Sequence, residues 1–123
     1  MTKIILIGLG GFLGTVIRYL LQSLTSYLYP FQFPLGTILI NVLGSFVIGL
    51  IYQFTNQNTI LSDDIRLFLT VGILGGFTTF SAFSIDVMLL YQNNGKVIAF
   101  IYLLLSVMLS IIAVFAGMTI FKN

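Results

Sequence analysis

Residues 72–84 read GILGGFTTFSAFS, and this stretch decides how the chain can fold. It lies inside a long apolar run, yet it consists largely of glycines, hydroxyl side chains and phenyl rings. Gly75-Gly76 followed by Thr78-Thr79 lowers the helix propensity in the middle of that run. In hydrocarbon, freed backbone groups are tolerated only where they are buried in protein or line a cavity. The stretch therefore predicts a helix break, and either a mere kink or a binding site would explain it.

The composition around this stretch is that of a membrane protein. Of 123 residues, 59% are hydrophobic and 7% are charged, whereas a soluble domain carries about 25% charged residues. Apolar runs long enough to cross a bilayer fall at about 4–24, 35–55, 66–91 and 97–121. Backbone groups must bond within each span, so all four should be helices. The sequence predicts an all-α, multi-pass transmembrane domain covering the whole chain.

Several classes of function are disfavoured by what the sequence lacks. With no His and no Cys, haem, thiolate and most transition-metal chemistry are excluded, and any bound cation would be held by oxygen. A net charge of +2 offers no basic face for nucleic acid. The middle of each span carries no acid or base, which disfavours proton-coupled transport of the kind found in small multidrug exporters. The chain is not expected to be an enzyme.

The few charges leave the orientation in the membrane nearly undetermined. Lys3, Arg66 and Lys122 fall on one side of a four-span topology, and Lys96 with Arg18 on the other. Such a weak positive-inside bias would let the chain insert both ways, so two opposite copies could form an antiparallel homodimer. A noisy count over so few charges explains the balance equally well.

Small residues repeat at four-residue spacing in the first two spans. Gly10 and Gly14 lie in the first, and Asn41, Ser45 and Gly49 in the second. This spacing lets helix backbones approach closely, either within one chain or between two copies.

Neutral polar side chains form single-sided stripes. Thr37 and Asn41 are four residues apart, and Tyr102, Ser106 and Ser110 repeat at the same interval. Each hydroxyl could simply bond the carbonyl four residues earlier in its own helix. Hydroxyls in register, one of them on a deep tyrosine, favour a hydrated groove instead.

Two rings and two charges complete the candidate site. Phe80 and Phe83 share one face of the third span, and the positive edge of a phenyl ring can solvate an anion without a fixed cation. Arg18 and Asp86 lie near the ends of their spans, where they could snorkel to the surface or handle ions.

The sequence GGFTTFSAFS, with Asn41 in the second span and Arg18-Tyr19 in the first, resembles the CrcB/Fluc fluoride channels over essentially the whole chain. The resemblance implies an antiparallel, dual-topology homodimer with two fluoride pores and one structural sodium ion at its centre. It implies passive export of cytoplasmic fluoride across the plasma membrane, with chloride excluded, as a protection against fluoride toxicity.

The resemblance also implies roles for individual residues. The fluoride pore would be formed by amide, hydroxyl and phenyl side chains: Thr37, Asn41, Phe80, Ser81, Phe83, Tyr102, Ser106 and Ser110. A vestibule would contain Arg18, and the sodium ion would be held by the backbone carbonyls of Gly75 and Thr78 from both copies.

Two positions depart from the family pattern. Ala82 stands where Thr is common, and Asp86 where Glu is usual. The first removes a hydroxyl beside the phenyl rings, and the second shortens the reach of a carboxylate. A transporter of another solute and a purely structural membrane subunit are the alternative functions.

Overall fold

The computed structural model describes residues 1–57 and 61–122, which are almost entirely helical. The elements in chain order are α1 (Thr2–Leu28), α2 (Leu35–Gln57), α3 (Asp63–Leu67), the π-helix η1 (Phe68–Leu74), α4 (Gly75–Phe77), α5 (Phe80–Asn94) and α6 (Lys96–Ile120). Elements α3 to α5 follow one another as a single apolar stretch. With α1, α2 and α6 they give four helical stretches long and apolar enough to cross a membrane. The predicted all-α fold, with four apolar helical stretches that could span a membrane, is confirmed.

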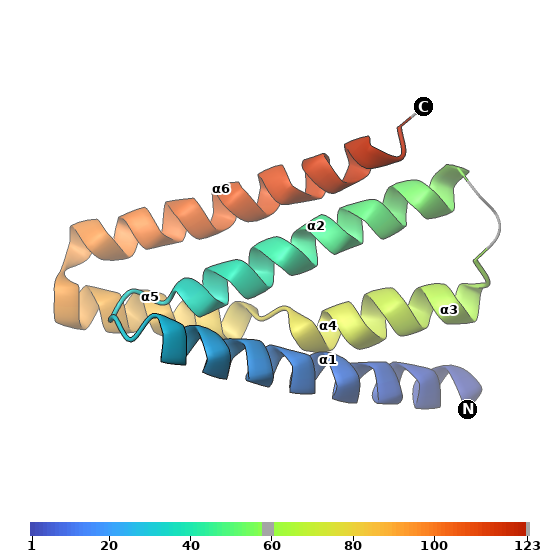
Figure 1. The fold of residues 1–123 in the computed structure, drawn as a ribbon, viewed down its shortest axis with the longest axis horizontal. Coiled ribbons are helices and arrows are strands. Elements are labelled where there is room, and N and C mark those ends of the chain that lie inside the picture. Colours follow the sequence, from blue (N-terminus) through green and yellow to red (C-terminus); the bar gives the residue numbers. More distant parts are fainter. Residues whose placement is uncertain (58–60, 123) are drawn as a thin grey trace.

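The four stretches pack as two layers, and both chain termini lie at the same end of the bundle (Figure 1). Helix α2 runs along α6, and α1 runs along η1 and α4, while α5 packs against α6. Four crossings return the chain to the side on which it began, as Figure 1 shows for the N and C ends. The sharp turn from α5 into α6 uses Gly95 at φ 92°, a conformation that a Cβ would strain.

The glycine spacing in α1 serves close packing within the chain. A Cβ added to Gly10 would lie 2.7 Å from the Phe68 carbonyl oxygen, and one on Gly14 would overlap the Ile73 carbonyl. A Cβ on Gly49 would likewise overlap the Val114 carbonyl in α6. Backbone therefore touches backbone at both contacts, as small-residue spacing in membrane helices predicts.

The backbone leaves helical geometry at two residues between α4 and α5. Thr78 has φ −77° and ψ 157°, and Thr79 has φ −151° and ψ 118°, both extended. The Thr79 hydroxyl accepts a hydrogen bond from the Ala82 N–H at 3.2 Å and so caps the start of α5. We call Thr78 and Thr79 the interruption. The short helix α4 separates it from the π-helix η1, an irregularity that is frequent at functional sites.

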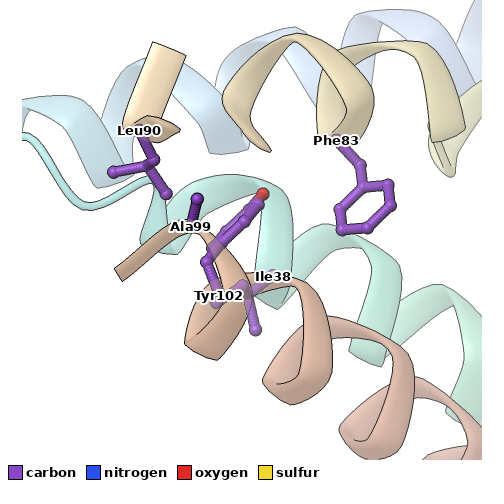
Figure 2. Close-up of a cluster of buried hydrophobic side chains, with 5 residues drawn as sticks. All are labelled: Ile38, Phe83, Leu90, Ala99 and Tyr102. Atoms are coloured by element: carbon purple, nitrogen blue, oxygen red, sulfur yellow. The ribbon is translucent and has the colours of Figure 1, made fainter. Parts of the chain in front are cut away.

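A cluster of buried side chains lies where α2, α5 and α6 meet. It consists of Ile38, Phe83, Leu90, Ala99 and Tyr102, drawn in Figure 2. Many other large apolar side chains are exposed, including Phe12, Phe100 and Phe115. Lipid tails are as apolar as these side chains, so exposure of this kind carries no penalty in a bilayer.

Candidate functional site

A cavity of about 480 Å³ lies between α2, the interruption and α6. We call it the central cavity. The predicted site residues that line it are Asn41, Gly75, Thr78, Phe80, Phe83, Ser106 and Ser110. They come from the second, third and fourth apolar stretches, so the fold brings together most of what the sequence singled out.

The Asn41 side chain pairs with the backbone of the interruption. Its Nδ2 donates to the Thr79 carbonyl at 3.0 Å, and its Oδ1 accepts from the Thr79 N–H at 2.9 Å. The amide thus replaces both partners that an extended peptide loses when it leaves the helix. The sequence indicated Asn41 as a donor to a ligand. In the structure the Asn41 amide also holds the backbone of the interruption in place. One of its two N–H donors takes no part in these bonds.

Arg18 reaches the same interruption from α1. Its Nη1 donates to the Thr78 carbonyl at 3.4 Å, and the contact is partly buried. The side chain is therefore directed to the break in the helix. From the sequence alone, it could equally have extended to the membrane surface. The Thr78 carbonyl already has this partner, which affects its suitability as a cation ligand.

The rings of Phe80, Phe83 and Tyr102 form a row that runs from the central cavity into the buried core. The centroids of Phe80 and Phe83 are 5.4 Å apart, and those of Phe83 and Tyr102 are 5.7 Å apart. The Phe83 ring is 8% exposed, whereas Phe80 is 78% exposed. The two predicted pore rings are thus neighbours, but one lies in the core and the other on the outer face of the chain.

Tyr102 is fully buried, and its hydroxyl donates to Asp86 Oδ2 at 3.0 Å. Figure 2 shows its ring directed from α6 towards α5, with the oxygen at the far end. The shorter side chain of Asp86 therefore still reaches the polar stripe of α6, and it points inward rather than to the membrane surface. Asp86 was a weak candidate in the sequence, and this contact makes it part of the site.

Two buried hydroxyls beside Tyr102 are left without partners. Thr37 Oγ1 and Ser106 Oγ make no hydrogen bond to any group within residues 1–57 and 61–122. Both hydroxyls lie near the Tyr102 hydroxyl, but neither meets the geometry of a hydrogen bond to it. We call Thr37, Tyr102 and Ser106 the hydroxyl cluster.

Other hydroxyls in the chain bond the carbonyl four residues earlier. Thr55, Thr70 and Ser84 do so at 2.8–2.9 Å. That ordinary arrangement therefore does not account for Thr37 or Ser106. A buried hydroxyl without a partner costs free energy, so an unbonded pair indicates a place for water or a ligand.

The remaining candidates lie at the edges of this arrangement. Ser81 is exposed, and its hydroxyl lies 3.4 Å from that of Thr79. Ala82 is half-buried and contributes its backbone N–H to the Thr79 cap. The position where a Thr hydroxyl was expected thus takes part through its backbone.

The chemistry of the central cavity is neutral. Its described lining contains amide, hydroxyl and phenyl groups but no charged side chain. No group of three His, Cys, Asp or Glu side chains that could hold a metal is found in the described part of the chain. Neutral donors can replace water around an anion without binding it so tightly that it cannot leave.

Fold and site together define a multi-pass membrane protein with a neutral, mostly apolar cavity among its helices, into which a few hydrogen-bonding side chains point. Residues 5–118 match the family described as "CrcB-like protein, Camphor Resistance (CrcB)". The chain belongs to the CrcB family.

Named relatives cover the whole chain. A protein of Agrobacterium fabrum named "Fluoride-specific ion channel FluC" is 42% identical over 123 residues, which is all of this chain and 98% of the relative. Proteins of the same name are 38% identical in Campylobacter jejuni, over 99% of each chain, and in Ruminiclostridium cellulolyticum, over 100% of this chain and 95% of the relative.

Proposed function

We propose that this protein is a fluoride-selective channel that lets fluoride leave the cytoplasm passively. The observation that carries the proposal is the central cavity, where the Asn41 amide, the Ser106 and Ser110 hydroxyls and the Phe80 and Phe83 rings converge. The names of the relatives support the choice of fluoride. The role is protective, since fluoride accumulating in the cytoplasm is toxic.

Fluoride is small and strongly hydrated, so each water it loses must be replaced by a close donor. The uncommitted Asn41 N–H and the Ser110 hydroxyl supply donors at the cavity, and the ring edges of Phe80 and Phe83 add weaker positive potential. The unpartnered hydroxyls of Thr37 and Ser106 supply the next donors, beside Tyr102. Chloride is larger and gains less from donors set this close together.

The functional unit we propose is an antiparallel homodimer with two pores. Phe80 is 78% exposed, and the central cavity and the interruption lie beside it. Irregular backbone facing lipid at mid-membrane is not tolerated, so another surface must cover it. A second copy inserted in the opposite orientation would do so, and the near balance of Lys and Arg between the two sides favours both orientations.

A sodium ion at the dimer centre would be held by carbonyls of the interrupted helix. The Thr79 N–H donates to Asn41 and not to Gly75, so the Gly75 carbonyl loses its usual helical donor. That observation fits Gly75 as a cation ligand. Thr78 fits less well, because its carbonyl accepts from Arg18 and a guanidinium repels a nearby cation. When bound, the ion supplies positive charge that fixes the two interruptions together.

Arg18 would also act on the anion. Its charge lies at the Thr78 carbonyl, at the edge of the interruption. A positive charge there raises the local concentration of fluoride at the vestibule.

The proposal is tested in liposomes loaded with fluoride or chloride and containing the purified protein. Ion-selective electrodes should record rapid fluoride efflux and little chloride efflux, with no proton or sodium gradient imposed. Chloride leaving as fast as fluoride, or no efflux of either ion, would overturn it. Flux that requires a gradient would indicate a transporter. Phe80→Ile should leave the dimer intact in gel filtration but reduce fluoride efflux, whereas a structural subunit would be unaffected.

A further inference from the structure

A second, smaller cavity is lined by Asp86, the hydrogen-bond partner of Tyr102. Its volume is about 180 Å³, and we call it the outer cavity. Its polar lining residues are Gln32, Asp86, Asn93 and Asn94. It lies at the end of the bundle where the α1–α2 connection meets the end of α5, opposite the two termini in Figure 1.

Tyr102 lies between lining residues of the two cavities. Ser106 lines the central cavity, one turn of α6 away from Tyr102 and on the same face. Asp86 lines the outer cavity and accepts the Tyr102 hydroxyl at 3.0 Å. The fully buried Tyr102 therefore contacts a lining residue of each cavity, Asp86 of the outer cavity and Phe83 of the central cavity. Asp86, Tyr102 and Ser106 thus form a row of polar side chains between the two cavities, in which Tyr102 bonds Asp86 and the Ser106 hydroxyl has no partner among the described residues.

The rim of the outer cavity is made of side-chain amides. Asn94 Nδ2 donates to Gln32 Oε1 at 3.1 Å, which ties the end of α5 to the α1–α2 connection. Gln32, Asn93 and Asn94 are all exposed. Each side-chain amide carries two N–H donors, and the bond to Gln32 uses only one of the two on Asn94. The rim can therefore offer neutral donors to a hydrated anion, as the central cavity does.

Asp86 at the inner end of the outer cavity has the opposite effect. Its carboxylate disfavours an anion unless donors face it, and Tyr102 supplies one such donor. An ion entering from this side would meet amide donors before it meets the carboxylate. The amides are thus placed where they can offset that repulsion.

We propose that the outer cavity is a second mouth of the pathway, and that Gln32, Asn93 and Asn94 form a site for a small hydrated anion there. This inference rests on the proposed fluoride channel and extends it. The rim amides hold the ion while it exchanges water for protein donors. The hydroxyl cluster then receives it beyond Tyr102.

The test places opposite charges at the rim. Asn94→Asp should lower fluoride efflux from liposomes, and Asn94→Lys should raise it, each about threefold at roughly 10 mM ionic strength. This is the size expected when one charge acts through water on an ion about 7 Å away. Both rates should approach that of the wild type near 1 M salt, because screening is then nearly complete.

Asn56 provides matched controls. It is an exposed asparagine near the end of α2, at the end of the bundle where the termini lie, and it lines neither cavity. Asn56→Asp and Asn56→Lys should leave the efflux rate within experimental error of the wild type. Asn93→Asp and Asn93→Lys repeat the test at a rim position outside the Gln32–Asn94 bond, should that bond prove necessary for folding.

The outcomes separate this inference from the proposed function. Rim variants that behave like the Asn56 controls would overturn the second mouth while leaving the channel in place. The same direction of change for Asp and Lys at both Asn93 and Asn94 would also overturn it, since only a structural effect ignores the sign of the charge. A wild-type protein that passes no fluoride would instead refute the channel itself.

Discussion

The interruption and the hydroxyl cluster are both polar sites inside apolar helices, but they differ in how their polar atoms are bonded. At the interruption, Asn41 pairs with both backbone groups of Thr79, and Arg18 donates to Thr78. In the hydroxyl cluster, Thr37 and Ser106 have no partner within the described residues. The first site has its polar groups bonded, whereas two of the three hydroxyls of the second are unbonded.

Because of this difference, substitutions at the two sites should affect the stability of the fold and the fluoride flux differently. Breaking a hydrogen-bonded pair leaves a backbone group without a partner in apolar surroundings, and this lowers the stability of the fold. Removing a hydroxyl that bonds nothing in the protein costs none of that. Substitutions at the interruption should therefore lower both the stability and the fluoride flux, while removal of the Thr37 or Ser106 hydroxyl should lower the flux alone.

The largest loss of stability is expected for Asn41→Ala. It leaves the N–H and the carbonyl of Thr79 without the amide that pairs with them. We expect the free energy of unfolding in mixed micelles to fall by about 3 kcal/mol, from two orphaned groups at roughly 1–3 kcal/mol each. Asn41→Asp keeps the acceptor and should cost less. An unchanged stability for Asn41→Ala would show that the pair does not brace the interruption.

The second-largest loss is expected for Gly14→Ala. Its Cβ would overlap the Ile73 carbonyl, which is backbone and cannot move cheaply. We expect a loss of about 2 kcal/mol from overpacking, measured by the same unfolding assay. Gly8→Ala is the control, because its Cβ would meet no atom of the described chain within 4 Å. It should be neutral or stabilising, since alanine favours a helix. Equal effects would contradict the close contact of α1 with η1.

A smaller loss is expected for Arg18→Gln. It keeps a side chain that can donate to the Thr78 carbonyl but removes the charge. We expect less than about 1 kcal/mol in stability and a two- to threefold fall in fluoride efflux at low salt, of the size expected for one charge acting through water. The difference in efflux should disappear at high salt. A salt-independent loss would show that Arg18 acts only by bracing the interruption.

Much of this architecture could be predicted from the sequence, because membrane helices follow from the length of apolar runs. The four apolar helices were predicted from the length of the apolar runs, and the close approach at Gly10 and Gly14 from their four-residue spacing. The contacts of Asn41 and Arg18 with the interruption could not, since they depend on which backbone groups a break leaves free. Sequence spacing locates a polar side chain on a helix face but not its partner on another helix.

The outer cavity was missed for a related reason. Gln32 and Asn94 are 62 residues apart, the first in the α1–α2 connection and the second at the end of α5, and both fall in sequence segments that look like ordinary polar loops. The contact of Asp86 with Tyr102 joins α5 to α6 across 16 residues. Only the packing of these elements shows that the amides and the carboxylate line one cavity.

The smallest change in stability, and the sharpest test of the comparison, is expected for Ser106→Ala and Thr37→Val. Neither hydroxyl has a hydrogen-bond partner in the described chain, so its loss should alter the free energy of unfolding by less than about 0.5 kcal/mol or raise it. Fluoride efflux should nevertheless fall several-fold, because a dehydrating ion loses a donor beside Tyr102. Thr55→Val is the control, since its hydroxyl bonds the Ile51 carbonyl in its own helix and lines neither cavity. Unchanged efflux for both cluster variants would place the ion elsewhere, and a large loss of stability would show that the two hydroxyls are bonded through water that the fold requires.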